Sequence, residues 1–240
     1  MMINTDNFPS IIAVVPAAGI GRRMQSQFPK QYLTIGTKTI LEHAISTLIE
    51  QPLITRIVIV LNSEDCWFHL LPIVYNTRIT TITGRQTRAD SVMAGLKAVP
   101  HESWVMIHDA VRPCLHPEDL YRLLSVITDS PVGGILATPV RDTIKCSQGG
   151  NPVVVSHTIE RQNLWHALTP QLFPISILLP CMQRAIKEGI MLNDEASALE
   201  YEGYHPAIIL GRHDNIKVTY PEDIALASFY LLQQHHKEKI

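Results

Sequence analysis

Short apolar runs alternate with helical patterns along nearly the whole chain, and this alternation restricts the possible folds most strongly. The first run, IIAVV at residues 11–15, suits a strand buried on both faces of a parallel sheet. The spacing of strands and helices predicts βαβ units, and therefore an α/β fold whose mostly parallel sheet carries helices on both faces. The expected strands are Ile11–Pro16, Arg56–Leu61, Thr80–Thr83, Trp104–His108, Gly134–Pro139 and His205–Leu210. The expected helices are about Ile40–Gln51, Glu64–Leu71, Thr87–Val99, Pro117–Asp129, Ile175–Glu188, Asp194–Tyr201 and Pro221–Gln234.

Residues 140–161 interrupt this pattern. They contain two β-prone stretches around the turn sequence GGNP at residues 149–152, which predicts a hairpin projecting from the main sheet. Because an isolated two-stranded hairpin is only marginally stable in water, we expect this arm to be covered by a second subunit. No repeat or linker divides the chain, so residues 1–240 are expected to form a single domain.

Charge, hydropathy and cysteine spacing exclude several classes of protein. The net charge of −2 gives no reason to expect binding to nucleic acid. No apolar run approaches the roughly 20 residues of a membrane span, and the N-terminus lacks a signal-peptide pattern, so we expect a cytoplasmic protein without membrane contact. The cysteines are widely spaced and form no CxxC pair, which favours buried free thiols over disulfides or a zinc site.

The loop after the first strand carries the clearest functional signal. Its segment AAGIG at residues 17–21 leaves the backbone unobstructed, so that N–H groups can approach a bound anion closely. Arg22, Arg23 and Lys30 add positive charge, and no Asp or Glu occurs between residues 7 and 41. A GxG pattern alone is equally compatible with a plain strand–helix turn. Together with the cations it predicts a polyphosphate site.

Two common nucleotide-binding loops do not match this segment. The sequence reads GxGxxM, so it lacks the third glycine of the dinucleotide fingerprint, and Glu42, about 20 residues on, lies at a helix start. No GK[ST] follows the second glycine, as a Walker A loop requires. The pattern therefore disfavours a Rossmann dehydrogenase and a P-loop enzyme.

Two more motifs follow expected strands. In the segment HDAVRP, Asp109 and Arg112 come directly after a strand, where a carboxylate can hold a hydroxyl group or a metal ion. The alternative is a turn closed by an ion pair. Ser91, in the segment RADS, can offer its hydroxyl to a base or ribose, or lie in an ordinary first helical turn. Ligands of parallel sheets bind beyond the carboxyl ends of strands, so we expect these motifs and the glycine loop to form one site.

The C-terminal third offers further candidates. Lys217 follows a strand and is either a phosphate-binding lysine or an ordinary surface lysine. Asp194 and Glu195 stand at the start of the helix expected at residues 194–201, which favours a role at its N-terminus over a paired-carboxylate metal site.

Taken together, these motifs resemble one family, the 2-C-methyl-D-erythritol 4-phosphate cytidylyltransferases of the non-mevalonate isoprenoid pathway. The similarity extends from about residue 11 to residue 230. It is carried by the segments PAAGIGRRMQSQFPKQY, TILEH, RADSV, HDAVRPC, GGILATPVRDTIK, LWHALTPQ, DEASALE and NIKVT followed by PED. The resemblance implies a Rossmann-like fold of the nucleotide-diphospho-sugar transferase type, and a homodimer in which the arm at residues 140–161 completes the neighbouring subunit's site.

The resemblance also implies three groups of site residues. Catalytic residues that stabilise the transition state or position the substrate phosphate would be Arg23, Lys30, Arg161 and Lys217. Residues lining the cytidine triphosphate (CTP) site would be Ala17, Ala18, Gly19 and Ser91. Residues contacting methylerythritol phosphate would be Asp109, Arg112, Thr143 and Thr169. Thr143 and Arg161 would come from the neighbouring subunit.

The implied reaction joins CTP and 2-C-methyl-D-erythritol 4-phosphate to give 4-diphosphocytidyl-2-C-methyl-D-erythritol and pyrophosphate. Mg²⁺ would be held mainly by the CTP phosphates, with no protein metal site. The family usually has Gly-Gly before the RADS segment, whereas this chain has Gly84-Arg85-Gln86-Thr87, so contacts to cytosine are not transferred to this loop. The alternatives are a nucleotidyltransferase for ribitol 5-phosphate or another sugar or alditol phosphate, and a module that senses CTP without turnover.

Overall fold

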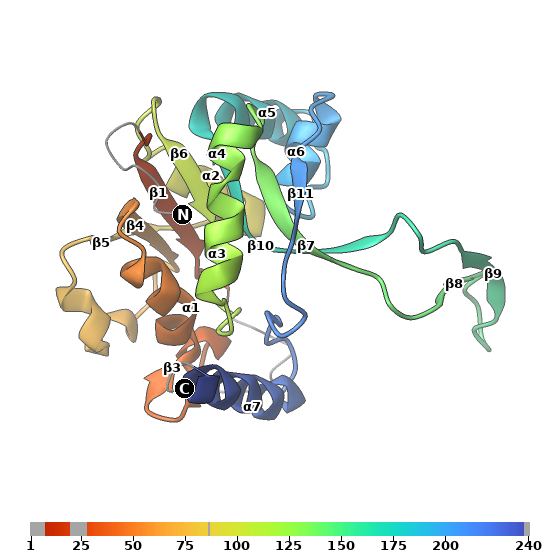
Figure 1. Ribbon diagram of the computed structural model, residues 1–240, viewed down its shortest axis with the longest axis horizontal. Helices are drawn as coiled ribbons and strands as arrows, with labels where there is room; N and C mark the ends of the chain where they lie inside the picture. Colours follow the sequence, from red (N-terminus) through yellow and green to blue (C-terminus); the bar gives the residue numbers. More distant parts are fainter. Residues whose placement is uncertain (1–7, 20–27, 86, 238–240) are drawn as a thin grey trace.

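A seven-stranded sheet runs through the centre of the computed structural model, which describes residues 8–19, 28–85 and 87–237 (Figure 1). The strand order is β11-β7-β10-β6-β1-β4-β5. Strand β10 runs antiparallel to both of its neighbours, β6 and β7, and the other pairs are parallel. The strands are β1 (Ile11–Pro16), β4 (Ile54–Leu61), β5 (Ile79–Thr83), β6 (Trp104–Ile107), β7 (Gly134–Pro139), β10 (Trp165–Pro174) and β11 (Ala207–Leu210). The prediction of a mostly parallel α/β fold is confirmed.

Helices cover both faces of this sheet. In β1, Ile11, Ala13 and Val15 belong to the core that packs under α1 and α3, whereas Ile12 and Val14 belong to the core under α2, α5 and α6. Both cores are apolar, which explains why β1 is an uninterrupted apolar run. The helices are α1 (Ile40–Glu50), α2 (Arg88–Leu96), α3 (Pro117–Leu124), α4 (Val126–Asp129), α5 (Ile175–Lys187), α6 (Ala196–Tyr201) and α7 (Glu222–Lys237). None of the helices in the described ranges is long and apolar enough to cross a membrane.

Several smaller elements connect the sheet to these helices. Short 3₁₀ helices are η3 (Lys30–Tyr32), η4 (Phe68–Leu70) and η5 (Pro72–Tyr75), and a small hairpin is formed by β2 (Thr34–Ile35) and β3 (Lys38–Thr39). Helix α1 begins with a capping box, because Thr39 and Glu42 exchange side-chain and backbone hydrogen bonds. The Ile40 N–H at the start of α1 donates to the Leu33 carbonyl at 2.8 Å, which ties α1 to the residue after η3, the short helix that carries Lys30.

The expected strands all occur, and their ends shift by at most two residues. The sequence analysis nevertheless missed β10, which lies between β7 and β6 in the middle of the sheet. Pro170 has no N–H to donate to a strand ladder, so it argues against a central strand. In β10 the register with β7 shifts between Ala167 and Gln171, and the proline lies in that interruption.

Two helix predictions need correction. Residues 64–71 do not form one helix: Asn62 Oδ1 accepts a hydrogen bond from the Glu64 N–H, and Asp65 Oδ1 accepts from the N–H groups of Trp67 and Phe68. Such local bonds stabilise turns in competition with a helix. The helix expected at residues 117–129 is divided into α3 and α4 at Ser125, whose hydroxyl donates to the Arg122 carbonyl.

The segment at residues 140–161 forms the expected hairpin. Strands β8 (Ile144–Ser147) and β9 (Val155–Ile159) pair antiparallel and lie far out from the central sheet (Figure 1). The turn between them uses Gly149 and Gly150 at φ values of 76° and 89°, a region that residues with a Cβ rarely adopt. Val153, Val154 and Val155 are 69%, 48% and 62% exposed. The arm thus presents an apolar tip to its surroundings.

Candidate active site

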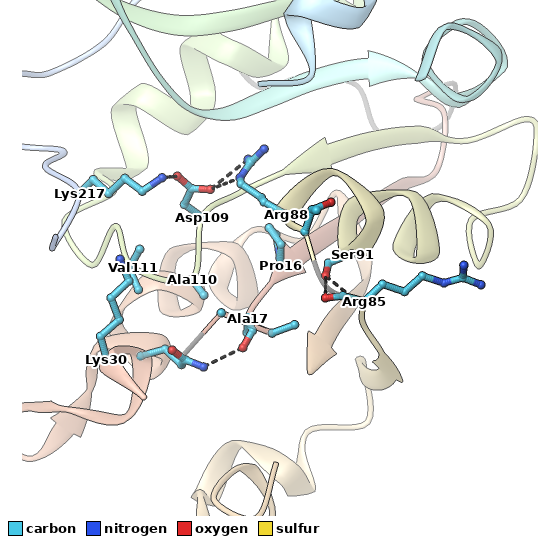
Figure 2. Close-up of a pocket in the computed structure, with 14 residues that line it drawn as sticks. Pro16, Ala17, Lys30, Arg85, Arg88, Ser91, Asp109, Ala110, Val111 and Lys217 are labelled. Carbon is cyan, nitrogen blue, oxygen red and sulfur yellow. Dashed lines mark hydrogen bonds and ion pairs between the residues drawn. The ribbon is translucent and has the colours of Figure 1, made fainter. Parts of the chain in front are cut away.

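A pocket opens at the carboxyl ends of β1 and β6, where the strand order reverses between the two halves of the sheet. Such a switch point is the usual ligand site of an open α/β sheet. The structure brings together the glycine loop, the loop before α2, the turn after β6 and the segment before α7 (Figure 2). The lining residues are Pro16, Ala17, Ala18, Gly19, Lys30, Gln31, Arg85, Thr87, Arg88, Ser91, Asp109, Ala110, Val111 and Lys217.

The described part of the glycine loop, residues 16–19, continues directly from β1. The Ala17 N–H donates to the Val60 carbonyl at 2.8 Å, and Gln31 Nε2 donates to the Ala17 carbonyl at 2.7 Å. Among the described residues outside its chain neighbours, no atom lies within 4 Å of a Cβ built at Gly19, so these residues leave space for a ligand there. Arg23, predicted to stabilise the transition state, lies outside the described residues.

Lys30 lies at the start of η3 and lines the pocket. Its Nζ donates to the Val218 carbonyl at 3.2 Å, which links η3 to the segment that precedes α7. Gln31, the next residue, is buried and ties the same short helix to the glycine loop. The position of Lys30 is therefore determined by packing on both sides of the pocket.

The loop before α2 packs closely against the glycine loop. A Cβ at Gly84 would lie 2.8 Å from Ala18 Cβ, 2.9 Å from Ser91 Oγ and 2.9 Å from Val60 Cγ1, so this position requires glycine. Ser91 Oγ accepts a hydrogen bond from the Arg85 N–H at 3.1 Å and donates to the Arg85 carbonyl at 3.2 Å. Figure 2 shows the Arg85 side chain extending away from the Asp109 group. Ser91 thus shapes this loop as well as lining the pocket.

Asp109 is the centre of a chain of ion pairs across the pocket. Lys217 Nζ lies 2.8 Å from Asp109 Oδ2, and Arg88 Nε donates to Asp109 Oδ1 at 3.0 Å. Figure 2 shows the two cations approaching the carboxylate from opposite sides. Arg88 also holds Glu195, with Nη1 to Oε1 at 2.7 Å and Nη2 to Oε2 at 3.2 Å. Arg112 Nε lies further away, 3.7 Å from Asp109 Oδ2. The strand-end turn therefore carries an ionised carboxylate with two close cations and a third at a longer distance.

Electrostatics keep Asp109 ionised. Burial by itself would raise the pKa of its carboxyl, but the charges of Arg88, Lys217 and Arg112 outweigh burial and hold this pKa well below the ordinary value of 3.8. His108 next to it is fully buried, and burial lowers the pKa of its imidazole to about 4. His108 is therefore neutral near pH 7.

Thr169 and Arg112, expected to contact substrate, are buried beside the pocket and do not line it. Thr169 Oγ1 accepts a hydrogen bond from the Asp109 N–H at 3.0 Å and lies 3.0 Å from His108 Nδ1. Arg112 Nη1 donates to the Asn215 carbonyl at 2.7 Å. These contacts hold Asp109 and the segment that carries Lys217 in place.

Thr143 and Arg161 are both exposed on the arm and do not line the pocket of their own chain. The structure therefore does not bring them together with the other predicted site residues within one chain. Their sequence positions, on either side of β8 and β9, place them at the base of the projecting hairpin.

Sequence reasoning missed Arg88 and Glu195 as site residues. Arg88 stands in the RADS segment, directly after the loop that follows an expected strand, and this position could have indicated a pocket residue. Glu195 lies 107 positions further along the chain, and no local pattern indicates that it pairs with Arg88. Asp194 does cap α6 as expected, because its Oδ1 accepts from the Ser197 N–H at 3.0 Å. Glu195 instead binds the pocket residue Arg88.

The described residues do not form a protein cage for a metal ion. No group of three or more His, Cys, Asp or Glu side chains gathers within residues 8–19, 28–85 and 87–237. The pocket carboxylate, Asp109, already has a cation on each oxygen.

Comparisons with known proteins agree over nearly the whole chain. It matches the family described as IspD, 2-C-methyl-D-erythritol 4-phosphate cytidylyltransferase, over residues 11–233. The enzymes of this name from Serratia proteamaculans strain 568 and Salmonella arizonae are each 58% identical to it, over 94% and 95% of this chain and 96% and 97% of theirs. The crystal structure of the Francisella tularensis IspD superposes with a TM-score of 0.78 at 31% identity, covering 92% of this chain and 99% of that one. The chain belongs to the 2-C-methyl-D-erythritol 4-phosphate cytidylyltransferase family.

Proposed function

We propose that the pocket transfers the cytidylyl group of CTP to 2-C-methyl-D-erythritol 4-phosphate, releasing pyrophosphate and forming 4-diphosphocytidyl-2-C-methyl-D-erythritol, a precursor of isoprenoids. The observation that carries this proposal is the placement of Lys30, Arg88 and Lys217 around one pocket at the β1–β6 switch point. Membership of the family identifies the two anions that these cations serve.

The reaction needs no general base. A phosphate oxygen of methylerythritol phosphate attacks the α-phosphorus of CTP, the bond from that phosphorus to the bridging oxygen breaks, and pyrophosphate departs with the electron pair. The attacking oxygen is already ionised near neutral pH. Catalysis therefore consists of bringing two polyanions together and stabilising the charge that develops during in-line transfer. This explains why neutral, buried His108 can be structural.

Each part of the pocket then has a role. The backbone at Ala17, Ala18 and Gly19, with Ser91, holds the nucleotide, and Lys30 together with Arg23 stabilises the transferred phosphoryl group. Magnesium would enter as part of the CTP complex, because Mg²⁺ is commonly held by substrate phosphates together with few protein carboxylates.

Asp109 and Lys217 face the acceptor substrate. Lys217 binds the methylerythritol phosphate group, and Asp109 accepts a hydrogen bond from a substrate hydroxyl. Thr169 acts on Asp109 by accepting a hydrogen bond from its backbone N–H, and Arg112 acts on the segment that carries Lys217 by donating to the Asn215 carbonyl. The side chain of Lys217 is 37% exposed, which leaves it room to turn from Asp109 to a phosphate.

The arm supplies the remaining contacts in a homodimer. Thr143 and Arg161 lie outside the pocket of their own chain, and the apolar tip at residues 153–155 has no covering partner within the chain's described residues. A second copy that covers the arm would bring Thr143 and Arg161 to the partner's methylerythritol phosphate. We place the enzyme in the cytoplasm because the reaction consumes CTP.

Acceptor specificity tests this function directly. Pyrophosphate release is measured with CTP and methylerythritol phosphate, with CTP and ribitol 5-phosphate, and with CTP alone. We expect rapid release with methylerythritol phosphate and little with the other two mixtures. Preferential turnover of ribitol 5-phosphate would identify the alternative alditol phosphate enzyme, and tight CTP binding without release would identify a sensor.

A further inference from the structure

We infer that Glu195 is a positioning residue for the acceptor half of the site: it holds Arg88 against Asp109, so that Asp109 keeps a hydrogen-bonded cation when Lys217 turns to the substrate phosphate. The inference rests on the proposed roles of Asp109 and Lys217. It assigns a task to a buried carboxylate that does not line the pocket.

The Arg88 guanidinium lies between two carboxylates. It makes two hydrogen bonds to Glu195, at 2.7 and 3.2 Å, and its Nε donates to Asp109 Oδ1 at 3.0 Å. A bidentate arginine–carboxylate pair restricts the orientation of the guanidinium plane more than a single contact does. With both Nη atoms bound to Glu195, the Nε–H of Arg88 points toward Asp109 Oδ1.

Glu195 is itself held firmly by the core of the sheet. Its side chain is 1% exposed, and Gln171 of β10 clamps the turn on both sides of it. Gln171 Nε2 donates to Asp194 Oδ2 at 2.8 Å, and Gln171 Oε1 accepts from the Ala196 N–H at 3.1 Å. The anchor for Arg88 is therefore a central strand rather than a surface loop.

The two cations on Asp109 differ in how tightly they are held. Lys217 contacts Asp109 Oδ2 at 2.8 Å and its side chain is 37% exposed, whereas Arg88 has Glu195 as a second partner. An anionic substrate therefore draws Lys217 away more easily than Arg88. The Asp109 side chain is only 8% exposed, and losing both hydrogen-bonded cations would leave this buried charge with Arg112 alone, whose Nε lies 3.7 Å from Oδ2. Arg88, oriented by Glu195, prevents that loss.

The test is a double-mutant cycle in the full-length enzyme. Glu195→Gln keeps the shape but replaces one acceptor by a donor that faces Arg88, and Arg88→Met removes the partner at similar volume. We expect Glu195→Gln to raise the KM for methylerythritol phosphate about tenfold, while the KM for CTP stays within about twofold. Arg88→Met and the double variant should show the same selective rise, because Glu195 acts through Arg88.

Controls separate positioning from general stability. Glu202 Oε2 pairs with Arg184 Nη1 at a distance of 3.1 Å, and neither residue lines the pocket. Glu202→Gln should therefore change neither the KM for methylerythritol phosphate nor the KM for CTP. If Glu195→Gln does not fold, Arg88→Lys replaces it, because lysine cannot bridge both carboxylates and should cause the same selective loss. An equal rise in both KM values, or independent effects that multiply in the double variant, would overturn the inference. Absence of turnover in the unmodified enzyme would instead overturn the proposed function.

Discussion

At the scale of single residues, Gly84 and Gly19 are expected to be glycines for different reasons: neighbouring side chains leave no room for a Cβ at Gly84, whereas at Gly19 the room is needed by the bound nucleotide. Gly84→Ala would place a Cβ within 2.9 Å of Ala18, Ser91 and Val60, and should lower the free energy of unfolding by about 1–3 kcal/mol. The added Cβ of Gly19→Ala would have no atom of the described residues beyond its chain neighbours within 4 Å, so we expect this variant to keep its stability and to raise the KM for CTP. Urea unfolding and initial rates measure the two effects. Similar losses of stability in both variants would contradict this difference.

Lys30 provides a second prediction at this scale. Its side chain lines the pocket and contacts the Val218 carbonyl at 3.2 Å. If it stabilises the transferred phosphoryl group, Lys30→Ala should lower kcat by on the order of a hundredfold and change CTP affinity only a few-fold. Lys38→Ala, at an exposed position of β3, is the matched control. A loss confined to CTP affinity would assign Lys30 to ground-state binding instead.

At the scale of secondary structure, local patterns predicted the parallel strands well and failed where the fold overrides them. Strand β1 was predictable because a strand buried on both faces must be apolar throughout. Strand β10 was not, because Pro170 breaks the local signal and its place in the sheet depends on β6 and β7. The same holds for the site: the glycine loop has a local signature, whereas the pairing of Arg88 with Glu195 is visible only after folding.

The junction of β6 and β10 yields a prediction about pH. His108, just after β6, contacts Thr169 of β10 at 3.0 Å, and burial lowers the pKa of its imidazole to about 4 from an ordinary 6.5. Between these values the unfolded chain binds a proton that the folded chain does not. This contribution to stability is therefore complete above about pH 6.5 and is lost as the pH falls toward 4, amounting to about 3 kcal/mol.

Urea unfolding between pH 7 and pH 4.5 measures this dependence. The His108→Gln variant cannot titrate there, so its free energy of unfolding should fall less steeply over this range than that of the unmodified enzyme. His101→Gln, at an exposed position in a turn, is the control. Equal slopes for the unmodified enzyme and His108→Gln would show that His108 titrates alike in both states.

At the scale of the whole molecule, we propose that one chain does not contain a complete site, because Thr143 and Arg161 lie on the projecting arm. Arg161→Ala and Lys30→Ala damage different parts of that site, one on the arm and one in the pocket. Mixed subunits should regain activity, because the pocket of the Arg161→Ala chain keeps Lys30 and receives an intact arm from its partner. Lys30→Ala mixed with Lys217→Ala should regain none, since both changes lie in the pocket. No rescue after demonstrated subunit exchange would contradict sharing of the site.

The fate of each phosphorus atom of CTP distinguishes cytidylyl transfer from other reactions of CTP at this pocket. CTP labelled at the α-phosphorus or at the γ-phosphorus is incubated with methylerythritol phosphate and the enzyme. The α-label should appear in the cytidine-diphospho product, and the γ-label in pyrophosphate, with one pyrophosphate formed for each methylerythritol phosphate consumed. Release of the α-label as free CMP, or transfer of the γ-label to the acceptor, would contradict cytidylyl transfer at this pocket.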